Sequence, residues 1–108
     1  MSQVTTHVLD AVTGTPAVGV SVSLQDADGT TIAHAATNAD GRVSQFGPDA
    51  LSAGRYRVVF DTAAYFAASG TETLYPSVTI DFELADPVAH YHVPLLLSPF
   101  AYSTYRGS

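Results

Sequence analysis

Residues 77–84 read Ser-Val-Thr-Ile-Asp-Phe-Glu-Leu, a strict alternation of polar and apolar side chains. In an extended chain successive side chains point to opposite faces, so the four apolar residues share one face and the four polar residues share the other. This period of two differs from the period of 3.6 that a helix requires. The stretch therefore predicts a β-strand with one buried and one exposed face.

The same period recurs on both sides of this stretch, and clusters of Gly, Pro, Asn and Asp interrupt it. It predicts about eight strands, the clearest of them over residues 3–9, 18–25, 30–37, 54–61, 77–84, 90–97 and 102–108. Only residues 62–68 favour a helix, because they are rich in alanine, follow the potential N-cap Asp61 and end before Gly70. The sequence thus predicts an all-β sandwich of two sheets with one short helix.

The composition of the chain limits its size class and its partners. With 108 residues, one domain over residues 1–108 is expected. Ten acidic residues stand against four arginines and no lysine, giving a net charge of −6, so neither a nucleic acid nor an anionic membrane surface is an expected partner. The chain has no cysteine, which excludes disulfides and thiolate metal sites.

Nothing in the sequence predicts a membrane span or a secretion signal. The longest nearly uncharged apolar stretch, residues 91–102, contains two prolines and is shorter than the roughly 20 residues that a spanning helix needs. The first residues carry neither a basic segment nor an apolar one, so the cytoplasm is the expected location. Yet 46% of the residues are hydrophobic and only 13% are charged, a surplus of apolar residues that calls for an explanation.

The stretch 90–97 offers both this explanation and candidate chemistry. His90 and His92 point to the same face of the predicted strand, together with Pro94 and Leu96, while the opposite face carries Tyr91, Val93, Leu95 and Leu97. Both faces are thus apolar enough to be covered. Because a domain of this size has one core, we expect a second subunit to cover the histidine face.

Several interpretations of these histidines stay open at this level. The His-x-His pair is a coincidence of strand alternation, or the two histidines bind zinc together with a third histidine. In a third interpretation, the histidines serve acid–base hydrolysis without a metal. His34, in the middle of the strand 30–37, is expected to be a surface or packing residue. The chain has no Gly-x-Ser-x-Gly motif for a nucleophilic serine and no phosphate-binding glycine loop.

Five stretches together carry a resemblance to a known family. They are Thr-His-Val-Leu-Asp-Ala at 6–11 with Gly-Thr-Pro-Ala at 14–17, Thr-Asn-Ala-Asp-Gly-Arg at 37–42, Tyr-Pro at 75–76, His-Tyr-His-Val-Pro-Leu-Leu-Leu-Ser-Pro at 90–99 and Tyr-Ser-Thr-Tyr-Arg-Gly-Ser at 102–108. Over essentially its whole length the chain resembles the transthyretin-related 5-hydroxyisourate hydrolases. The ending Tyr-Arg-Gly-Ser is the specific part, since the hormone-carrying transthyretins resemble these enzymes but lack it.

The resemblance implies a transthyretin-like fold, a homotetramer built as a dimer of dimers, and a site in the channel between the dimers. The catalytic set that it implies falls on His7, Arg42, His92 and Ser108. Tyr105, Arg106 and Gly107 would line the same cavity and bind the substrate, and His90 would lie at its rim. No cofactor and no metal are expected.

The implied reaction is hydrolysis of 5-hydroxyisourate, a product of urate oxidation, to 2-oxo-4-hydroxy-4-carboxy-5-ureidoimidazoline. Such a ring opening needs a base for water, a donor for the oxyanion and an acid for the leaving nitrogen. One of His7 and His92 is expected to be the base, and the other to orient it or to protonate the leaving nitrogen. Arg42 is expected to hold the oxyanion or the substrate. Ser108 would offer its hydroxyl and a terminal carboxylate, so that a C-terminal tag is expected to impair activity.

Two other functions remain to be weighed against this hydrolase. One is a transthyretin-like carrier of a small aromatic ligand without catalysis, for which the histidines and Arg42 make an unusually polar lining. The other is a structural or interaction sandwich, such as an adhesin-like or carboxypeptidase-associated domain, in which the histidines are incidental. The ending Tyr-Arg-Gly-Ser disfavours this second alternative.

Overall fold

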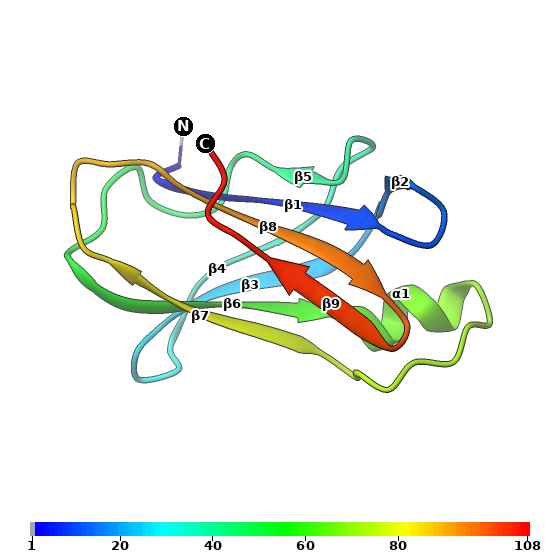
Figure 1. Cartoon of the computed structure of the whole chain (residues 1–108). Helices are drawn as coiled ribbons and strands as arrows, with labels where there is room; N and C mark the ends of the chain where they lie inside the picture. The colour runs from blue at the N-terminus through cyan, green and yellow to red at the C-terminus, as the bar shows by residue number, and fades with distance from the viewer. Residues whose placement is uncertain (1) are drawn as a thin grey trace.

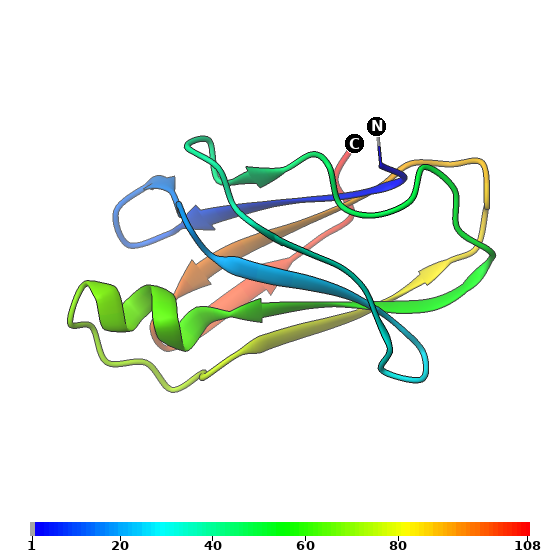
Figure 2. The same cartoon turned by 180° about the vertical axis from the view of Figure 1, so that it is seen from behind.

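The computed structural model describes residues 2–108 and shows two β-sheets packed face to face (Figure 1). Sheet A contains β1 (Val4–Asp10), β2 (Thr15–Pro16), β5 (Arg42–Val43), β8 (Tyr91–Ser98) and β9 (Ala101–Thr104). Sheet B contains β3 (Ser21–Asp26), β4 (Thr31–Ala36), β6 (Gly54–Asp61) and β7 (Val78–Leu84). The helix α1 (Thr62–Ala68) follows β6 at one end of the sandwich (Figure 2). The predicted all-β sandwich with one short helix is confirmed.

The order of the strands brings the two ends of the chain together. Sheet A runs β2-β1-β8-β9, with β5 also paired to β1, and sheet B runs β4-β3-β6-β7. Strands β1 and β8 are parallel and pair over seven residues from Val4 with Tyr91 to Asp10 with Leu97. The other strand pairs are antiparallel. Strands from the start and the end of the chain therefore form the centre of sheet A.

The core lies between the sheets and follows the predicted alternation. Val4 and Val8 of β1, Val22 and Leu24 of β3, Val58 and Phe60 of β6, and Leu95 and Leu97 of β8 are all completely buried. In β7, Val78 and Leu84 are buried and the residues between them alternate in exposure. Burying one such aliphatic side chain contributes about 1.5–3 kcal/mol, so these inward faces supply the main driving force for folding.

The helix forms where the sequence predicts it. The carboxylate of Asp61 accepts a hydrogen bond from the backbone N–H of Ala64 at 3.3 Å and so caps the first turn. At the other end Gly70 has a φ of 67°, a left-handed conformation that glycine adopts without a steric penalty. Tyr65 of the helix donates a hydrogen bond to the Asp10 carboxylate at the end of β1, which fixes the helix to sheet A.

Two predicted strands differ from the observed ones by more than one residue at one end, and two short strands were not predicted. The strand expected over 18–25 begins only at Ser21, because Gly19 has a φ of 79° and turns the chain, leaving Val18 exposed. Two short strands, β2 and β5, form outside the predicted strands, because each pairs with β1. The strand expected over 102–108 is wrong in its second half: β9 ends at Thr104, and beyond it the chain makes one isolated bridge at Gly107.

The domain prediction of 1–108 includes residue 1, which lies outside the described residues, and it stays a prediction. No helix among residues 2–108 is long and apolar enough to cross a membrane.

Candidate functional site

The candidate site lies on the outer face of sheet A, the face turned away from sheet B. Directly paired residues of neighbouring strands point to the same face, so the parallel register places Thr5 beside His92 and His7 beside Pro94. Both histidines are half-buried there. The alternation along β8 had predicted the face of His92, and the register adds that His7 of β1 lies on the same surface.

Arg42 reaches the same surface through β5, which pairs His7 with Arg42. A tight turn delivers it there: the Asn38 side-chain oxygen accepts hydrogen bonds from the backbone N–H groups of Asp40 at 2.9 Å and Arg42 at 3.0 Å. Gly41 completes the turn with a φ of 73°, and its carbonyl accepts a hydrogen bond from Val8 N–H. A Cβ at Gly41 would lie 2.5 Å from the Val8 carbonyl oxygen, so only glycine fits.

The C-terminal tail, residues 105–108, lies along β8 and covers His92. Leu95 pairs with Thr104 in the regular part of the ladder, and the bridge between His92 and Gly107 continues the same register. Gly107 N–H donates to the His92 carbonyl at 2.9 Å. A Cβ at Gly107 would collide with Cδ2 of the His92 ring and lie 3.2 Å from its Cγ. The missing side chain of Gly107 is thus what lets the tail pack against the imidazole.

These elements enclose a cavity of about 220 Å³, which we call the site hollow. Its lining includes Thr5, Arg42, His90, His92 and Ser108. The structure thereby brings together three of the four residues expected to be catalytic. The fourth, His7, does not line the site hollow itself but lies on the same face, two residues along β1 from Thr5, or about 7 Å.

His92 is the titratable group that the site perturbs most clearly. Burial of its ring lowers the pKa of His92 below the ordinary value of 6.5, and the charges of Arg42, His7 and His90 lower it further. A backbone hydrogen bond with Thr5 acts in the opposite direction. The imidazole is therefore held in its neutral form at neutral pH, the form that accepts a proton.

Two residues expected to bind substrate lie on the other side of the tail. Tyr105 and Arg106 line a second cavity of about 300 Å³, between the tail and β7, which His92 also borders. The Arg106 guanidinium lies over the Tyr91 ring, 4.4 Å from its centroid, and donates to the His90 carbonyl at 3.3 Å. Of the three expected substrate-binding residues, only Gly107 touches His92 from a position next to the site hollow.

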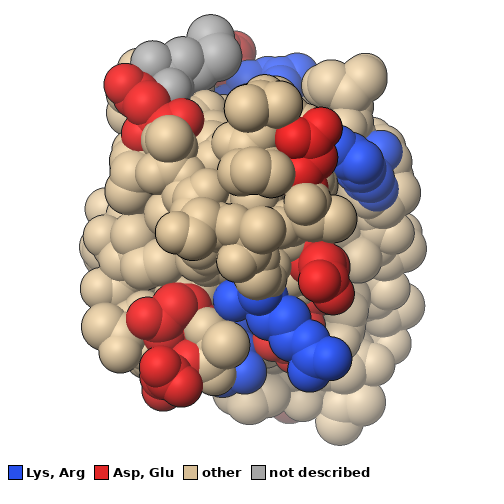
Figure 3. Space-filling model, turned by 90° about the vertical axis from the view of Figure 1, so that its left-hand side faces the viewer, with Lys and Arg blue, Asp and Glu red and all other residues tan. Residues whose placement is uncertain are grey.

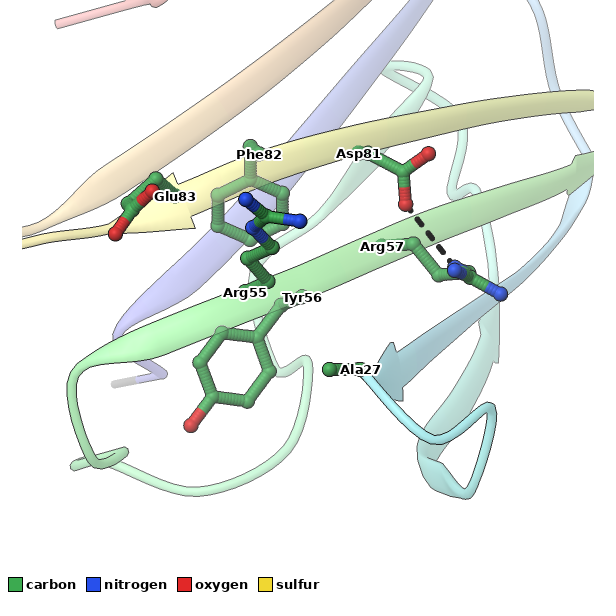
Figure 4. Close-up of a pocket in the computed structure, with 7 residues that line it drawn as sticks. All are labelled: Ala27, Arg55, Tyr56, Arg57, Asp81, Phe82 and Glu83. Atoms are coloured by element: carbon green, nitrogen blue, oxygen red, sulfur yellow. Dashed lines mark hydrogen bonds and ion pairs between the residues drawn. The ribbon is translucent and has the colours of Figure 1, made fainter.

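A larger cavity of about 410 Å³ shares Phe82 and Glu83 with this second cavity. At this cavity Arg55 and Arg57 of β6 pair with Glu83 and Asp81 of β7 in the sheet (Figure 4). Arg57 and Asp81 form an ion pair at 3.1 Å. No histidine lines this cavity.

On the end of the molecule drawn in Figure 3, acidic and arginine side chains are interspersed and form no continuous basic surface there. This region therefore resembles a paired charged surface more than a reaction site.

The structure adds a residue that sequence reasoning missed. Thr5 Oγ1 lies 2.9 Å from His90 Nε2 and 2.8 Å from His92 Nδ1. Thr5 lies two residues from His7 and therefore on the same face of β1. No sequence motif marks it, because its contact with the histidines depends on the pairing of β1 with β8. For the zinc alternative, residues 2–108 contain no group of three or more His, Cys, Asp or Glu side chains that could hold a metal ion. His34 is exposed and contacts Ser21, as expected for a surface histidine.

Comparisons with known proteins agree on one family. The sequence model of the HIUase/transthyretin family matches residues 4–107. A 5-hydroxyisourate hydrolase of Mesorhizobium japonicum is 47% identical, an alignment covering 98% of this chain and 92% of that protein. The structure of the Klebsiella pneumoniae 5-hydroxyisourate hydrolase has a TM-score of 0.90 at 46% identity, covering 100% of this chain and 94% of that one. Transthyretin from Sparus aurata has the same TM-score at 35% identity, covering 99% and 97%.

The packing of the tail on His92 predicts the effect of a single methyl group. In Gly107→Ala the new Cβ has no room beside the His92 ring, so the ring or the tail must move. We expect the imidazole resonances of His92 to shift in a two-dimensional NMR spectrum and the amide of residue 107 to exchange faster with solvent. In the control Ser103→Ala, an exposed position on β9, both signals should stay unchanged. Unchanged His92 resonances in Gly107→Ala would contradict this packing.

Proposed function

The chain belongs to the HIUase/transthyretin family, and from this premise we propose that it is a 5-hydroxyisourate hydrolase. The observation that carries the proposal is the convergence of Arg42, His92 and Ser108 in the site hollow, with His7 on the same face. These four residues come from four separate stretches of the chain. Relatives that carry this activity by name match the chain over nearly its full length.

The chemistry of the hollow fits hydrolysis of a cyclic amide-type bond. His92, held neutral, takes a proton from the attacking water, whose oxygen adds to the carbonyl carbon of the six-membered ring. Arg42 remains a cation at any working pH and stabilises the oxyanion that forms. His7 is placed beside Arg42 to protonate the leaving nitrogen, and the Ser108 hydroxyl orients the substrate or the water.

Tyr105, Arg106 and Gly107 take different parts in this proposal. Gly107 shapes the wall next to His92, where a side chain would intrude. Arg106 holds the tail in place through Tyr91 and the His90 carbonyl, and Tyr105 borders the neighbouring cavity, from which it contacts a substrate that extends beyond the site hollow.

A carrier without catalysis is the alternative from the same family. An apolar ligand would bind poorly here, because the lining of the site hollow consists largely of polar and charged side chains that it would desolvate without replacing their hydrogen bonds. The pKa of His92 is also perturbed in the direction that general-base catalysis requires. Both observations favour the hydrolase.

We also propose that the chain forms a homotetramer, a dimer of dimers. Sheet A ends in β9 and sheet B ends in β7, and both open edges lie on the same side of the sandwich (Figure 1). A second copy can extend both sheets there by edge pairing. The outer face of sheet A, with Leu9, Pro94 and Leu96 around the site, would then be covered by a second dimer, which accounts for the surplus of apolar residues. A cytoplasmic location stays a prediction from the sequence.

The activity is tested directly by generating 5-hydroxyisourate from urate with urate oxidase and following its ultraviolet absorbance as it decays. The protein should accelerate the decay, and His92→Ala should lower kcat/KM by about 100- to 10,000-fold, the range for loss of a general base. The matched control is His34→Ala, a histidine of sheet B, which should leave the rate unchanged. No acceleration by the wild-type protein would exclude the hydrolase, and full activity of His92→Ala would exclude the assigned base.

The acidic limb of the pH profile tests the electrostatics of the site. His92 is active when neutral, so kcat/KM should fall as the pH drops through its pKa, which lies below 6.5. Arg42→Gln removes a charge that lowers this pKa, so the pKa rises and the limb should move to higher pH, apart from any loss of maximal rate. His34→Ala should keep the wild-type limb. A limb that stays in place or moves to lower pH in Arg42→Gln would contradict the assignment.

The assembly is tested by light scattering on the purified protein, which should give the mass of four chains. Leu96→Glu places a charge in the middle of the outer face of sheet A, where burial without a partner is costly, and should reduce the mass to that of two chains. Val88→Glu, at a position 90% exposed between β7 and β8, should remain a tetramer. A wild-type monomer, or a tetramer of Leu96→Glu, would contradict the proposed interface.

A further inference from the structure

One hydroxyl connects two histidines at the edge of the site hollow. Thr5 Oγ1 lies 2.8 Å from His92 Nδ1 and 2.9 Å from His90 Nε2, both within hydrogen-bond distance. The sheet makes this bridge possible, because Thr5 pairs with His92 in the parallel register and His90 precedes His92 by two residues. The proposed mechanism assigns no role to this bridge.

A hydroxyl carries one proton, so it donates to only one of these two nitrogens. When both rings are neutral, the arrangement that satisfies all three groups has one ring nitrogen donating to Thr5 and Thr5 donating to the other ring. The tautomers of His90 and His92 are therefore coupled through the threonine. Either His92 carries its proton on Nδ1 and His90 accepts at Nε2, or the order is reversed.

The surroundings of His92 select between these two orders. Since Nδ1 is engaged by Thr5, Nε2 is the nitrogen left for the site hollow, where Arg42 also lies. A cation favours a bare nitrogen lone pair facing it over an N–H group. His90 is exposed, so water can accept the proton on its Nδ1. Both observations favour His92 with its proton on Nδ1 and Thr5 donating to His90.

We propose that Thr5 is a positioning residue that fixes the tautomer of His92, leaving Nε2 bare and aimed into the site hollow, with His90 as the acceptor at the other end of the bridge. The proposal rests on the hydrolase function above, in which His92 takes the proton of water. A neutral imidazole in water carries its proton mainly on Nε2, the tautomer that cannot act as a base at that nitrogen. Thr5 thus selects the tautomer that the reaction needs.

The charges that face His92 act together with this bridge. They come from Arg42 on β5, His7 on β1 and His90 on its own strand, and all three lower its pKa. They keep the ring neutral, and Arg42 also favours a bare Nε2, which leaves the proton on Nδ1. A proton on Nδ1 needs an acceptor, and the Thr5 hydroxyl lies at that nitrogen at 2.8 Å. The Thr5 backbone also hydrogen-bonds the ring, and Thr5→Val keeps that backbone while it removes the hydroxyl.

The test compares Thr5→Val, which keeps the shape and removes the hydroxyl, with Thr5→Ser, which keeps the hydroxyl. In protein labelled with ¹⁵N-histidine, the four histidines are assigned by single substitutions, and the Nδ1 and Nε2 chemical shifts report the tautomer of His92. We expect the proton on Nδ1 in the wild type and in Thr5→Ser, and mainly on Nε2 in Thr5→Val. With the substrate, kcat should fall about 10- to 100-fold in Thr5→Val and recover in Thr5→Ser.

The control is Ser21→Ala, which removes the equivalent contact of Ser21 Oγ with His34 Nε2 at 2.7 Å on sheet B and should not change kcat. A His92 proton on Nε2 in the wild type, or an unchanged tautomer and kcat in Thr5→Val, would overturn the proposal. Failure of the hydrolase function would show differently, as a wild-type protein that does not accelerate the decay, since the nitrogen shifts are measured without substrate.

Discussion

The parallel pairing of β1 with β8 is the constraint on which the rest of this structure depends. It joins residues 4–10 to residues 91–97, so that forming it closes a loop of most of the chain. Closing this loop costs conformational entropy, which the burial of side chains along the two paired strands must offset. Val8 and Leu95 are completely buried on the inner side, and the Thr6 hydroxyl, also buried, donates to the Val93 carbonyl at 2.6 Å. The outer side of the same pair carries His7, Thr5 and His92.

This pairing explains why the site is built on a sheet surface rather than in a deep cleft. Pairing between strands positions each residue of the site. Thr5 pairs with His92, Arg42 pairs with His7, and the tail continues the pairing of β8 with β9 as far as Gly107. Such a surface orients its groups well but leaves the side away from sheet B open, and the site hollow there measures about 220 Å³. Covering the outer face by other subunits would exclude water from it and strengthen the electrostatic interactions between Arg42 and a developing oxyanion.

Local sequence patterns predicted which strands and helix form more accurately than they predicted where each one begins and ends. Alternation identified β6 and β7 and the inward faces of β1 and β8, and the cap at Asp61 and the alanines after it located α1, since these features depend on near neighbours in the chain. The short strands β2 and β5 were missed because two residues have no period. The end of β9 was misplaced because the tail interacts with His92 through a single bridge, and nothing in its own sequence marks where regular pairing stops.

The sequence by itself determined the fold class, the family and the residue types of the site, because strand alternation, turn residues and the stretches around His7, Arg42, His92 and Ser108 are local properties of the chain. Only the tertiary structure decided which of these groups meet. It placed Arg42, His92 and Ser108 in one hollow, left His7 beside it, turned Arg106 towards Tyr91, and set the Thr5 hydroxyl between two histidines. Those relations follow from the registers of β1 with β8 and of β8 with the tail, and a register is fixed by packing between distant segments, which no local pattern specifies.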